Sequence, residues 1–199
     1  ASIHMAEHFS GLANCLLPPA ERVGGTPSAT LRLSDLALNS AKSALLAAGV
    51  PGDFVAVCPF SSGAIGGKSK DWPGFGELVQ RLTAAGHRVV ACPGPGEELQ
   101  LAERWPSVIP LPGLGVDVYA AVLSLATAVV ANDTGPGHLA AVVGVPLWSV
   151  LGPTDPARWG ARGPQVHLLR EWPHWPTADA LHQHLLPCLP KSQPLKETA

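Results

Sequence analysis

From residue 53 onward, short apolar runs alternate with segments whose apolar residues recur at helical spacing. Glycine, proline and acidic residues bound the apolar runs, which is typical of strands buried on both faces. The runs predict six strands, at residues 53–60, 87–94, 107–113, 128–133, 146–153 and 165–171. The helical spacing predicts five helices between or after them, at residues 73–86, 96–105, 116–127, 135–144 and 177–189.

The order of these elements predicts the fold class. Strands that alternate with helices are joined by right-handed crossovers and therefore lie parallel, with helices on both faces of the sheet. We expect an α/β fold with a Rossmann-like, doubly wound parallel sheet. In open sheets of this kind, ligands bind outside the carboxyl ends of the strands. The loops that follow the predicted strands are therefore the places to look for chemistry.

The residues before the first predicted strand show no such alternation. Residues 2–18 have the pattern of an amphipathic helix, and residues 18–33 form a connector rich in proline and glycine. Residues 34–49 predict a second helix, for which Ser34 or Asp35 is a suitable amino-terminal cap. This zone cannot easily enclose a core of its own.

Composition and charge exclude several classes of protein. With 199 residues, of which 46% are hydrophobic, the chain can form a packed core. A formal net charge of −2, with 13 Lys and Arg and no basic run, argues against nucleic acid or an anionic membrane surface as a partner. Because no apolar stretch reaches the ~18–20 residues that span a bilayer, and no leader pattern opens the chain, we expect a cytoplasmic protein without a transmembrane segment.

The cysteines are too far apart in sequence to suggest a metal or redox site. No C-x-x-C pair is present, so we expect buried, reduced thiols at Cys15, Cys58, Cys92 and Cys188. Nor does the sequence offer an acidic cluster suited to a divalent ion.

The loop after the first strand partly matches a nucleoside triphosphate loop. Gly67, Lys68 and Ser69 follow a strand, but only three residues separate Gly63 from Gly67 where that motif has four, and Pro73 delays the next helix. A nucleoside triphosphate hydrolase is therefore kept only as an alternative.

The same loop offers groups that an anion could use. Ser61, Ser62, Lys68 and Lys70 place hydroxyls and cations at the predicted binding edge of the sheet. A solvated basic loop would have the same composition.

The loop after the second strand carries two glycines and two acids. Gly94 and Gly96 lack the third glycine of the dinucleotide fingerprint, which argues against NAD binding. Glu97 or Glu98 is either a first-turn acid favoured by the helix dipole or a carboxylate that accepts hydrogen bonds from ribose hydroxyls.

The junction "NDTGPGHLAA", at residues 132–141, carries the strongest signal. Asp133 or Thr134 can cap the helix that follows, and Gly135 and Gly137 let backbone amides approach a ligand. A helix amino end carries roughly half a positive charge, which a diphosphate would complement. His138 either donates a hydrogen bond to phosphate or is a packing histidine.

A second polar turn follows the fifth strand. "GPTDP", at residues 152–156, has the spacing of a tight turn with internal hydrogen bonds. Thr154, Asp155 and Arg158 would face the same crevice as the preceding loops.

Several of these motifs together resemble one enzyme family. "KDWP" from Lys70, "GPGE" ending at Glu97, "NDTGPGHLAA" from Asn132, "GVP" ending at Pro146 and "GPTDP" from Gly152 stand in the order found in the carboxyl-terminal half of the glycosyltransferase family 9 heptosyltransferases. These enzymes build the inner core of bacterial lipopolysaccharide. The resemblance implies a GT-B architecture whose carboxyl-terminal domain binds a nucleotide-sugar donor, typically ADP-heptose, and an enzyme that works without a cofactor at the inner face of the inner membrane.

The resemblance also implies site residues and a mechanism. The donor-binding residues would be Ser61 or Ser62, Lys70, Glu97, Asp133, Thr134, Gly135 and His138. The resemblance further implies inverting, metal-independent transfer, in which fixed protein charges stabilise the departing ADP. The catalytic base and the groove that binds the lipopolysaccharide acceptor would lie in an amino-terminal domain. The residues upstream of residue 53 cannot form such a domain.

The chain then corresponds to the donor-binding half of such an enzyme, inactive alone. In this interpretation the chain divides into a linker with amino-terminal helices at 1–46, the donor domain at 47–190 and a flexible tail at 191–199. A stand-alone nucleotide-binding module without turnover is the alternative.

Overall fold

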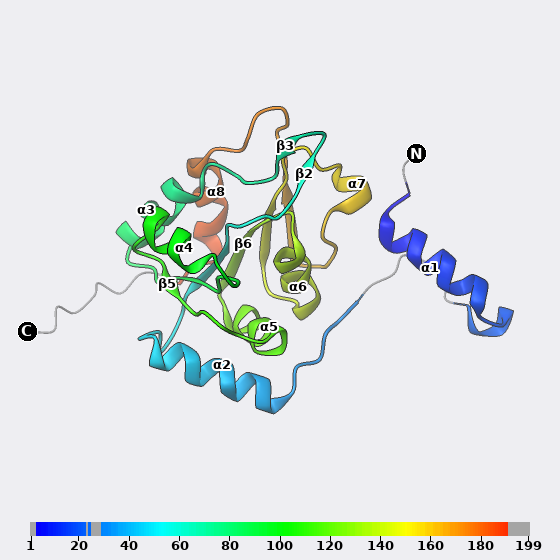
Figure 1. Cartoon of the computed structure of the whole chain (residues 1–199), viewed down its shortest axis with the longest axis horizontal. Helices are drawn as coiled ribbons and strands as arrows, with labels where there is room; N and C mark the ends of the chain where they lie inside the picture. Colours follow the sequence, from blue (N-terminus) through cyan, green and yellow to red (C-terminus); the bar gives the residue numbers. More distant parts are fainter. Residues whose placement is uncertain (1–2, 23, 25–28, 191–199) are drawn as a thin grey trace, which may run out of the picture.

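The computed structural model describes residues 3–22, 24 and 29–190 and confirms the α/β fold class (Figure 1). Its central sheet has six parallel strands in the order β5-β4-β1-β6-β7-β8. Each strand lies within a segment predicted from sequence: β1 (Val55–Cys58), β4 (Val89–Ala91), β5 (Ile109–Pro110), β6 (Ala128–Asn132), β7 (Leu147–Val150) and β8 (Val166–Leu169). The strand order changes direction between β1 and β6, and a ligand is expected at this point in a doubly wound sheet.

Helices cover both faces of the sheet. One layer consists of α2 (Asp35–Ala47), α5 (Val116–Leu125) and α6 (Gly135–Val143), and the other of α3 (Phe75–Ala84), α4 (Glu98–Arg104) and α8 (Ala178–Leu185). Because successive strand residues point to opposite faces, Ala56 and Cys58 pack in the first layer and Val55 and Val57 in the second. The continuous apolar runs in the sequence follow from this double burial.

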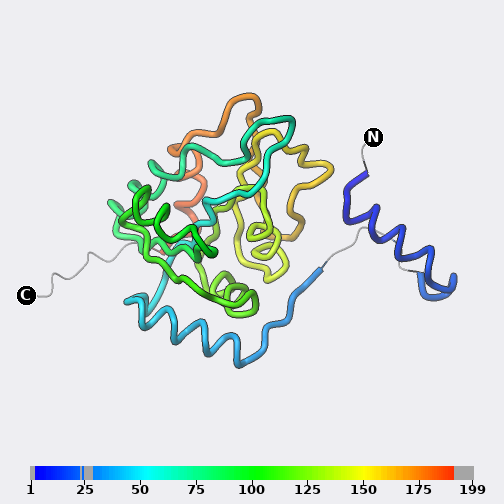
Figure 2. The backbone as a smooth tube through the Cα atoms, in the orientation of Figure 1, coloured from blue at the N-terminus to red at the C-terminus, as the bar shows by residue number. Residues whose placement is uncertain are grey.

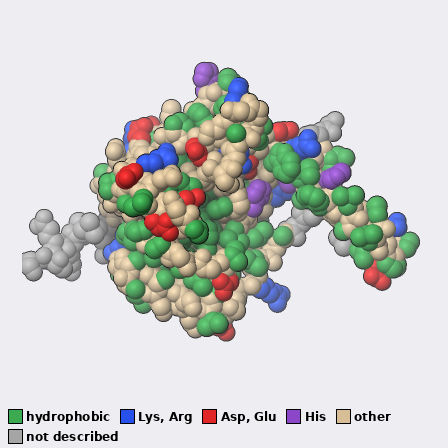
Figure 3. All heavy atoms as spheres, in the orientation of Figure 1, with side chains coloured by type: hydrophobic (Ala, Val, Ile, Leu, Met, Phe, Trp, Pro, Cys, Tyr) green, Lys and Arg blue, Asp and Glu red, His purple; other side chains and the backbone are tan. Residues whose placement is uncertain are grey.

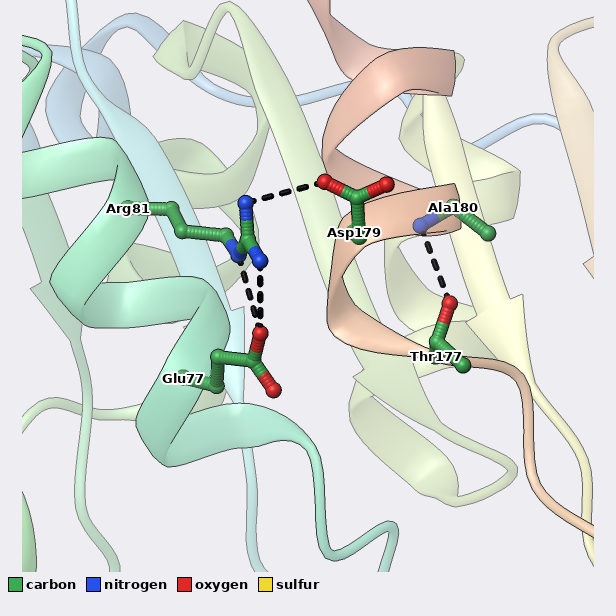
Figure 4. Close-up of polar contacts among 5 residues, drawn as sticks. All are labelled: Glu77, Arg81, Thr177, Asp179 and Ala180. Carbon is green, nitrogen blue, oxygen red and sulfur yellow. Dashed lines mark hydrogen bonds and ion pairs between the residues drawn. The ribbon is translucent and has the colours of Figure 1, made fainter.

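Helices α3 and α8 lie side by side, and polar contacts join their surfaces (Figure 4). Arg81 of α3 pairs with Glu77 on its own helix and reaches Asp179 at the start of α8, at 2.8 and 2.9 Å. These ion pairs are exposed, so the apolar contacts beneath them contribute most of the stability. Thr177 caps α8 by accepting a hydrogen bond from the Ala180 amide at 3.1 Å.

Two segments differ from the sequence predictions. The glycine-rich loop after β1 contains a hairpin of β2 (Ala64–Ile65) and β3 (Lys68–Ser69). Gly66 and Gly67 both have positive φ, at 56° and 75°, as a two-residue hairpin turn requires. These glycines therefore form the turn of a hairpin and not the phosphate-binding loop that the triphosphate alternative requires. The "GPTDP" segment leads into a short helix, α7 (Pro156–Trp159), capped by Asp155.

Helix α1 (Met5–Leu16), at the predicted position, stands beside the body (Figures 1 and 2). Its amino end contacts the body where His4 Nε2 lies 3.0 Å from the Gly160 carbonyl oxygen and Arg162 pairs with Glu7 at 2.9 Å. Much of its apolar surface faces solvent, including Phe9, Leu12 and Leu16 (Figure 3).

Helix α2 packs on α5 through Ala37, Ala41 and Leu45 and is capped by Ser34. The packed body therefore includes residues that the sequence assigned to the amino-terminal zone. The division of the chain at residue 47 stays a prediction, and the predicted tail at 191–199 lies outside the described residues.

The prediction of four buried cysteines is half wrong. Cys58 is buried and Cys92 half-buried, whereas Cys15, on the solvent side of α1, and Cys188, in the turn after α8, are exposed. Burial raises the pKa of the Cys58 thiol to about 11 and the pKa of the Cys92 thiol still further, so both stay protonated near neutral pH. Within the described part of the chain, no helix is long and apolar enough to cross a membrane.

Candidate functional site

A cavity of about 410 Å³ lies at the carboxyl ends of β1, β4 and β6, where the strand order changes direction. The loop after β1 contributes Ser61 and Ser62, and the turn before α4 contributes Gly94 and Glu97. The other walls are formed by α5, α6 and the segments before them, through Leu114, Tyr119, Thr134, Gly135 and Pro136.

A second hollow of about 320 Å³ lies on the other side of the α6 amino end. It shares Thr134 and Gly135 with the cavity, so the front of α6 separates two adjoining spaces. The remaining lining residues come from the hairpin, the end of β6, α6 and the segment around α7: Ile65, Lys70, Asp133, His138, Thr154 and Trp159.

All the candidate donor-binding residues line one or both of these spaces. Ser61, Ser62 and Glu97 line the cavity, and Lys70, Asp133 and His138 line the hollow. Thr134 and Gly135 line both. Thr154 also lines the hollow, but Asp155 and Arg158, expected at the same crevice, line neither space among the described residues.

Of the two predicted cap residues, Asp133 and Thr134, the structure places Thr134 at the cap position of α6, but neither side chain bonds to a first-turn amide. Thr134 occupies the cap position with extended φ and ψ, but its hydroxyl donates a long hydrogen bond, 3.4 Å, back to the Asn132 carbonyl. Helices α2 and α8, which do not border the site, are capped by their own hydroxyl side chains. Because Pro136 has no N–H, the first-turn amides left to an anion are those of Gly135 and Gly137, at the positive end of the helix dipole.

The two glycines at the start of α6 serve different purposes. A Cβ built on Gly135 meets no atom within 4 Å, so this position opens onto the two spaces. A Cβ on Gly137 would lie 3.2 Å from the Asn132 carbonyl oxygen and 3.5 Å from the Ala131 Cβ. Gly137 therefore lets α6 pack closely on β6, a packing role that the sequence did not predict.

Lys70 brings a cation to the same helix end. Its Nζ donates a hydrogen bond of 2.8 Å to the carbonyl oxygen of Asp133, immediately before α6. An ammonium group has three N–H donors, so this bond leaves two for a ligand. A positive charge and the positive end of a helix dipole therefore converge on one point.

The two candidate serines are not equivalent. Ser61 donates its hydroxyl proton to Asp71 at 2.6 Å, so that proton is already committed. Ser62 is exposed, and within the described residues its hydroxyl has no hydrogen-bond partner. Ser62 is therefore the hydroxyl that a ligand in the cavity could use without breaking an existing bond.

Glu97 lies at the start of α4 and shapes the turn before it. Its Oε2 accepts a 2.7 Å hydrogen bond from the Gly94 amide. A Cβ on Gly94 would lie 3.3 Å from the same oxygen, so a glycine allows this close approach. Within the described residues no second hydrogen bond to this carboxylate forms, and acceptor capacity is left for hydroxyl donors.

His138 and Asp133 form a coupled pair at the hollow. His138 Nε2 lies 3.7 Å from Asp133 Oδ1, an oxygen that is buried and has no hydrogen-bond partner among the described residues. Burial lowers the pKa of His138; Asp133 opposes this shift, and His4 and Lys70 add to it. The imidazole is therefore neutral near pH 7, beside a buried carboxylate.

Asn132, the last residue of β6, is a positioning residue that the sequence did not identify. Its side chain is fully buried; Oδ1 accepts from the Trp72 amide at 2.9 Å, and Nδ2 donates to the Pro59 carbonyl at 2.8 Å. One amide therefore fixes both ends of the loop that carries Ser61, Ser62 and Lys70. The only sequence signal was a polar residue ending an otherwise apolar strand.

Within the described residues, no group of three or more His, Cys, Asp and Glu side chains is arranged to hold a metal ion.

Substitutions of the two α6 glycines should separate binding from folding. Gly135→Ala adds a methyl group to open space, so we expect the free energy of unfolding to stay within about 0.5 kcal/mol and anion affinity to fall about tenfold. Gly137→Ala crowds a strand carbonyl and should cost about 1 kcal/mol, because overpacking outweighs the gain in helix propensity. Urea unfolding of both variants gives the free energy of unfolding, and titration with ADP gives the anion affinity. If the two variants were equally stable and lost the same amount of affinity, the separate roles of the two glycines would be contradicted.

Comparison with known proteins places this geometry in context. A family model described as glycosyltransferase family 9 (heptosyltransferase) matches residues 22–189. Over 139 residues the chain is 37% identical to lipopolysaccharide heptosyltransferase 1 of Pseudomonas aeruginosa. The matched segment is 65% of this chain and 36% of that protein.

Solved structures agree with this match. The Escherichia coli heptosyltransferase WaaC with ADP is 26% identical, with a TM-score of 0.62 over 85% of this chain and 54% of that one. A family 9 glycosyltransferase from Veillonella parvula, 18% identical, has a TM-score of 0.71 over 86% of this chain and 50% of that one, and supports the fold alone. The chain thus spans about a third of the curated relative and about half of each solved structure.

Proposed function

Because the chain belongs to glycosyltransferase family 9, we propose that it carries the donor-binding site of a heptosyltransferase that acts in lipopolysaccharide core synthesis, with ADP-heptose as the donor. The observation that carries the proposal is the uncapped amino end of α6, joined by the Lys70 ammonium, between two spaces of suitable size for a nucleoside and a sugar. The E. coli relative was solved with ADP, which supports the choice of nucleotide.

In this proposal the three parts of the donor occupy three adjoining places. The nucleoside lies in the 410 Å³ cavity, with its ribose hydroxyls donating to Glu97. The diphosphate lies at the front of α6, where Lys70, the first-turn amides and the Ser62 hydroxyl supply donors. The sugar extends into the 320 Å³ hollow beside Asp133 and His138.

The same groups would assist bond cleavage. In an inverting displacement, an acceptor hydroxyl attacks the anomeric carbon as ADP departs, and negative charge develops on the diphosphate. Fixed donors aimed at that charge lower the barrier because they need no reorganisation during the reaction. We propose that Lys70 and the α6 dipole supply this stabilisation in place of a metal ion.

The remaining machinery is assigned by resemblance to the family. The base that deprotonates the acceptor and the lipopolysaccharide-binding surface would belong to the amino-terminal domain of a GT-B enzyme. The whole enzyme would work in the cytoplasm, at the inner face of the inner membrane.

Calorimetric titration of the 199-residue chain with ADP tests the proposal. We expect saturable heat with a dissociation constant below about 1 mM. Absence of saturable heat from a chain shown to be folded by circular dichroism would count against it. Release of ADP from ADP-heptose in the presence of acceptor would distinguish an enzyme from a nucleotide-binding module without turnover.

The neutral state of His138 predicts a pH dependence. A diphosphate at the front of α6 would lie about one helical turn from the His138 imidazole, and its negative charge would favour the protonated form and raise the pKa of His138 above that of the free site. Affinity for ADP should therefore gain a contribution from His138 as pH falls from about 7 to about 5.5. Titration of ADP into the parent and into His138→Gln across this pH range isolates the contribution of His138. Protonation of ADP itself changes the affinity of both proteins by the same factor. The ratio of the two affinities should rise as pH falls; a constant ratio would contradict the placement of His138.

A further inference from the structure

We propose that Trp159 is a specificity-determining residue that stacks against the sugar ring of the donor. The proposal rests on the donor-binding function above and concerns a residue outside the motifs that point to that function. Trp159 lines the 320 Å³ hollow, and 43% of its surface is exposed. A large aromatic side chain left exposed in a concave site that also holds charged groups is typical of ligand binding.

The local backbone holds this exposed ring in place. Helix α7 ends at Trp159, whose amide donates to the Asp155 carbonyl at 3.0 Å, while the Asp155 carboxylate accepts from the Ala157 amide at 3.0 Å. The next residue, Gly160, is tightly enclosed: a Cβ there would lie 2.7 Å from the Pro156 carbonyl oxygen. The turn that presents the indole is therefore closely packed although the indole itself is exposed.

The walls of the hollow are divided between apolar and polar groups. Ile65, at 41% exposure, lines it from the hairpin, and Trp159 lines it from α7. Lys70, Asp133 and His138 supply a cation, a carboxylate and a neutral imidazole. A pyranose has the same division, because its C–H groups form apolar ring faces and its hydroxyls form a polar rim.

Arg158 restricts how the indole can be used. Its guanidinium lies over the Trp159 ring, 5.6 Å from the centroid, which is within cation–π range. A guanidinium covers one ring face at most, so the proposal places the sugar against the other face.

Stacking on Trp159 acts on the sugar and leaves the diphosphate contacts unchanged. A ring face carrying only C–H groups can lie flat on the indole, whereas an axial hydroxyl on that face would be desolvated without a partner. Trp159 should therefore select among ADP-sugars by the orientation of their hydroxyls, while ADP binds independently of it.

Calorimetric affinities of the 199-residue chain for ADP and for ADP-heptose test this inference. Trp159→Ala should lower the affinity for ADP-heptose about tenfold and change the affinity for ADP by less than about twofold. Trp159→Phe keeps an aromatic face and should recover part of the loss. Lys70→Ala is the reciprocal control, because it should weaken both ligands by a similar factor.

The outcomes separate the inference from the function on which it rests. If the parent binds ADP but Trp159→Ala leaves the affinities for ADP and for ADP-heptose both unchanged, the inference fails and the proposed function stands. Equal losses for both ligands would also overturn it, since the ring would then act through the diphosphate site or the fold. If the folded parent binds neither ligand, the proposed function fails, and the inference with it.

Discussion

Replacing Asn132 by alanine is expected to lower the free energy of unfolding by about 2–5 kcal/mol. The Asn132 side chain is fully buried and satisfies the Trp72 amide and the Pro59 carbonyl at once. Alanine would leave both backbone groups without a partner in the interior, and each such group costs about 1–3 kcal/mol. Urea denaturation followed by circular dichroism measures the change.

Asn39→Ala is the matched control. Asn39 is exposed on α2, and its side chain makes no hydrogen bond within the described residues, so its truncation should change stability by less than about 0.5 kcal/mol. A second variant, Asn132→Asp, keeps the acceptor for Trp72 but cannot donate to Pro59, and it should also be destabilised. If Asn132→Ala were as stable as Asn39→Ala, the positioning role of Asn132 would be wrong.

Lys70→Ala is expected to weaken ADP binding by about 10–100-fold. The ammonium is fixed at the front of α6 by the Asp133 carbonyl, so it meets a diphosphate without first being ordered. Loss of a charge-assisted hydrogen bond costs about 1.5–3 kcal/mol, which corresponds to this range of affinity. Calorimetric titration of ADP into the variant, at one ionic strength, gives the factor directly.

Lys68→Ala provides the control from the same loop after β1. The Lys68 Nζ lies over the Trp172 ring, 5.0 Å from its centroid, and Lys68 lines neither of the two spaces. Its removal should leave ADP affinity unchanged within about twofold. The triphosphate hydrolase alternative makes the opposite prediction, because there Lys68 is the phosphate-binding lysine. Equal losses in the two variants would mean that the charge of the whole loop, and not the placement of Lys70, determines binding.

The fold could be predicted because its signals are local. Strands such as Val55–Cys58 and Ala128–Asn132 are buried on both faces, so each is visible as an unbroken apolar run. The hairpin at 64–69 was missed because strands of two residues carry no periodicity, although the Gly66-Gly67 pair is a recognised turn signal.

The candidate site was predicted in its members but not in its details. Polar residues at strand ends converge on one edge of a parallel sheet, which brought Lys70, Glu97 and Thr134 around adjoining spaces. The different roles of Gly135 and Gly137 could not be predicted, because they depend on which side of α6 faces β6.

The role of Asn132 depends on contacts that are remote in sequence. Its partners Trp72 and Pro59 lie 60 and 73 positions away, and no local pattern contains them. The place of Trp159 in the hollow likewise depends on how the segment after β7 folds back toward the hairpin.

A crystal structure of the 199-residue chain grown with excess ADP tests the central claim most directly. That claim is that the uncapped front of α6 and the Lys70 ammonium together bind a diphosphate. We predict phosphate oxygens within about 3.2 Å of first-turn amides of α6 and of Lys70 Nζ, with the nucleoside in the cavity beside Glu97. Density for ADP at another place, with the α6 amides bonded to the protein's own side chains, would contradict the claim.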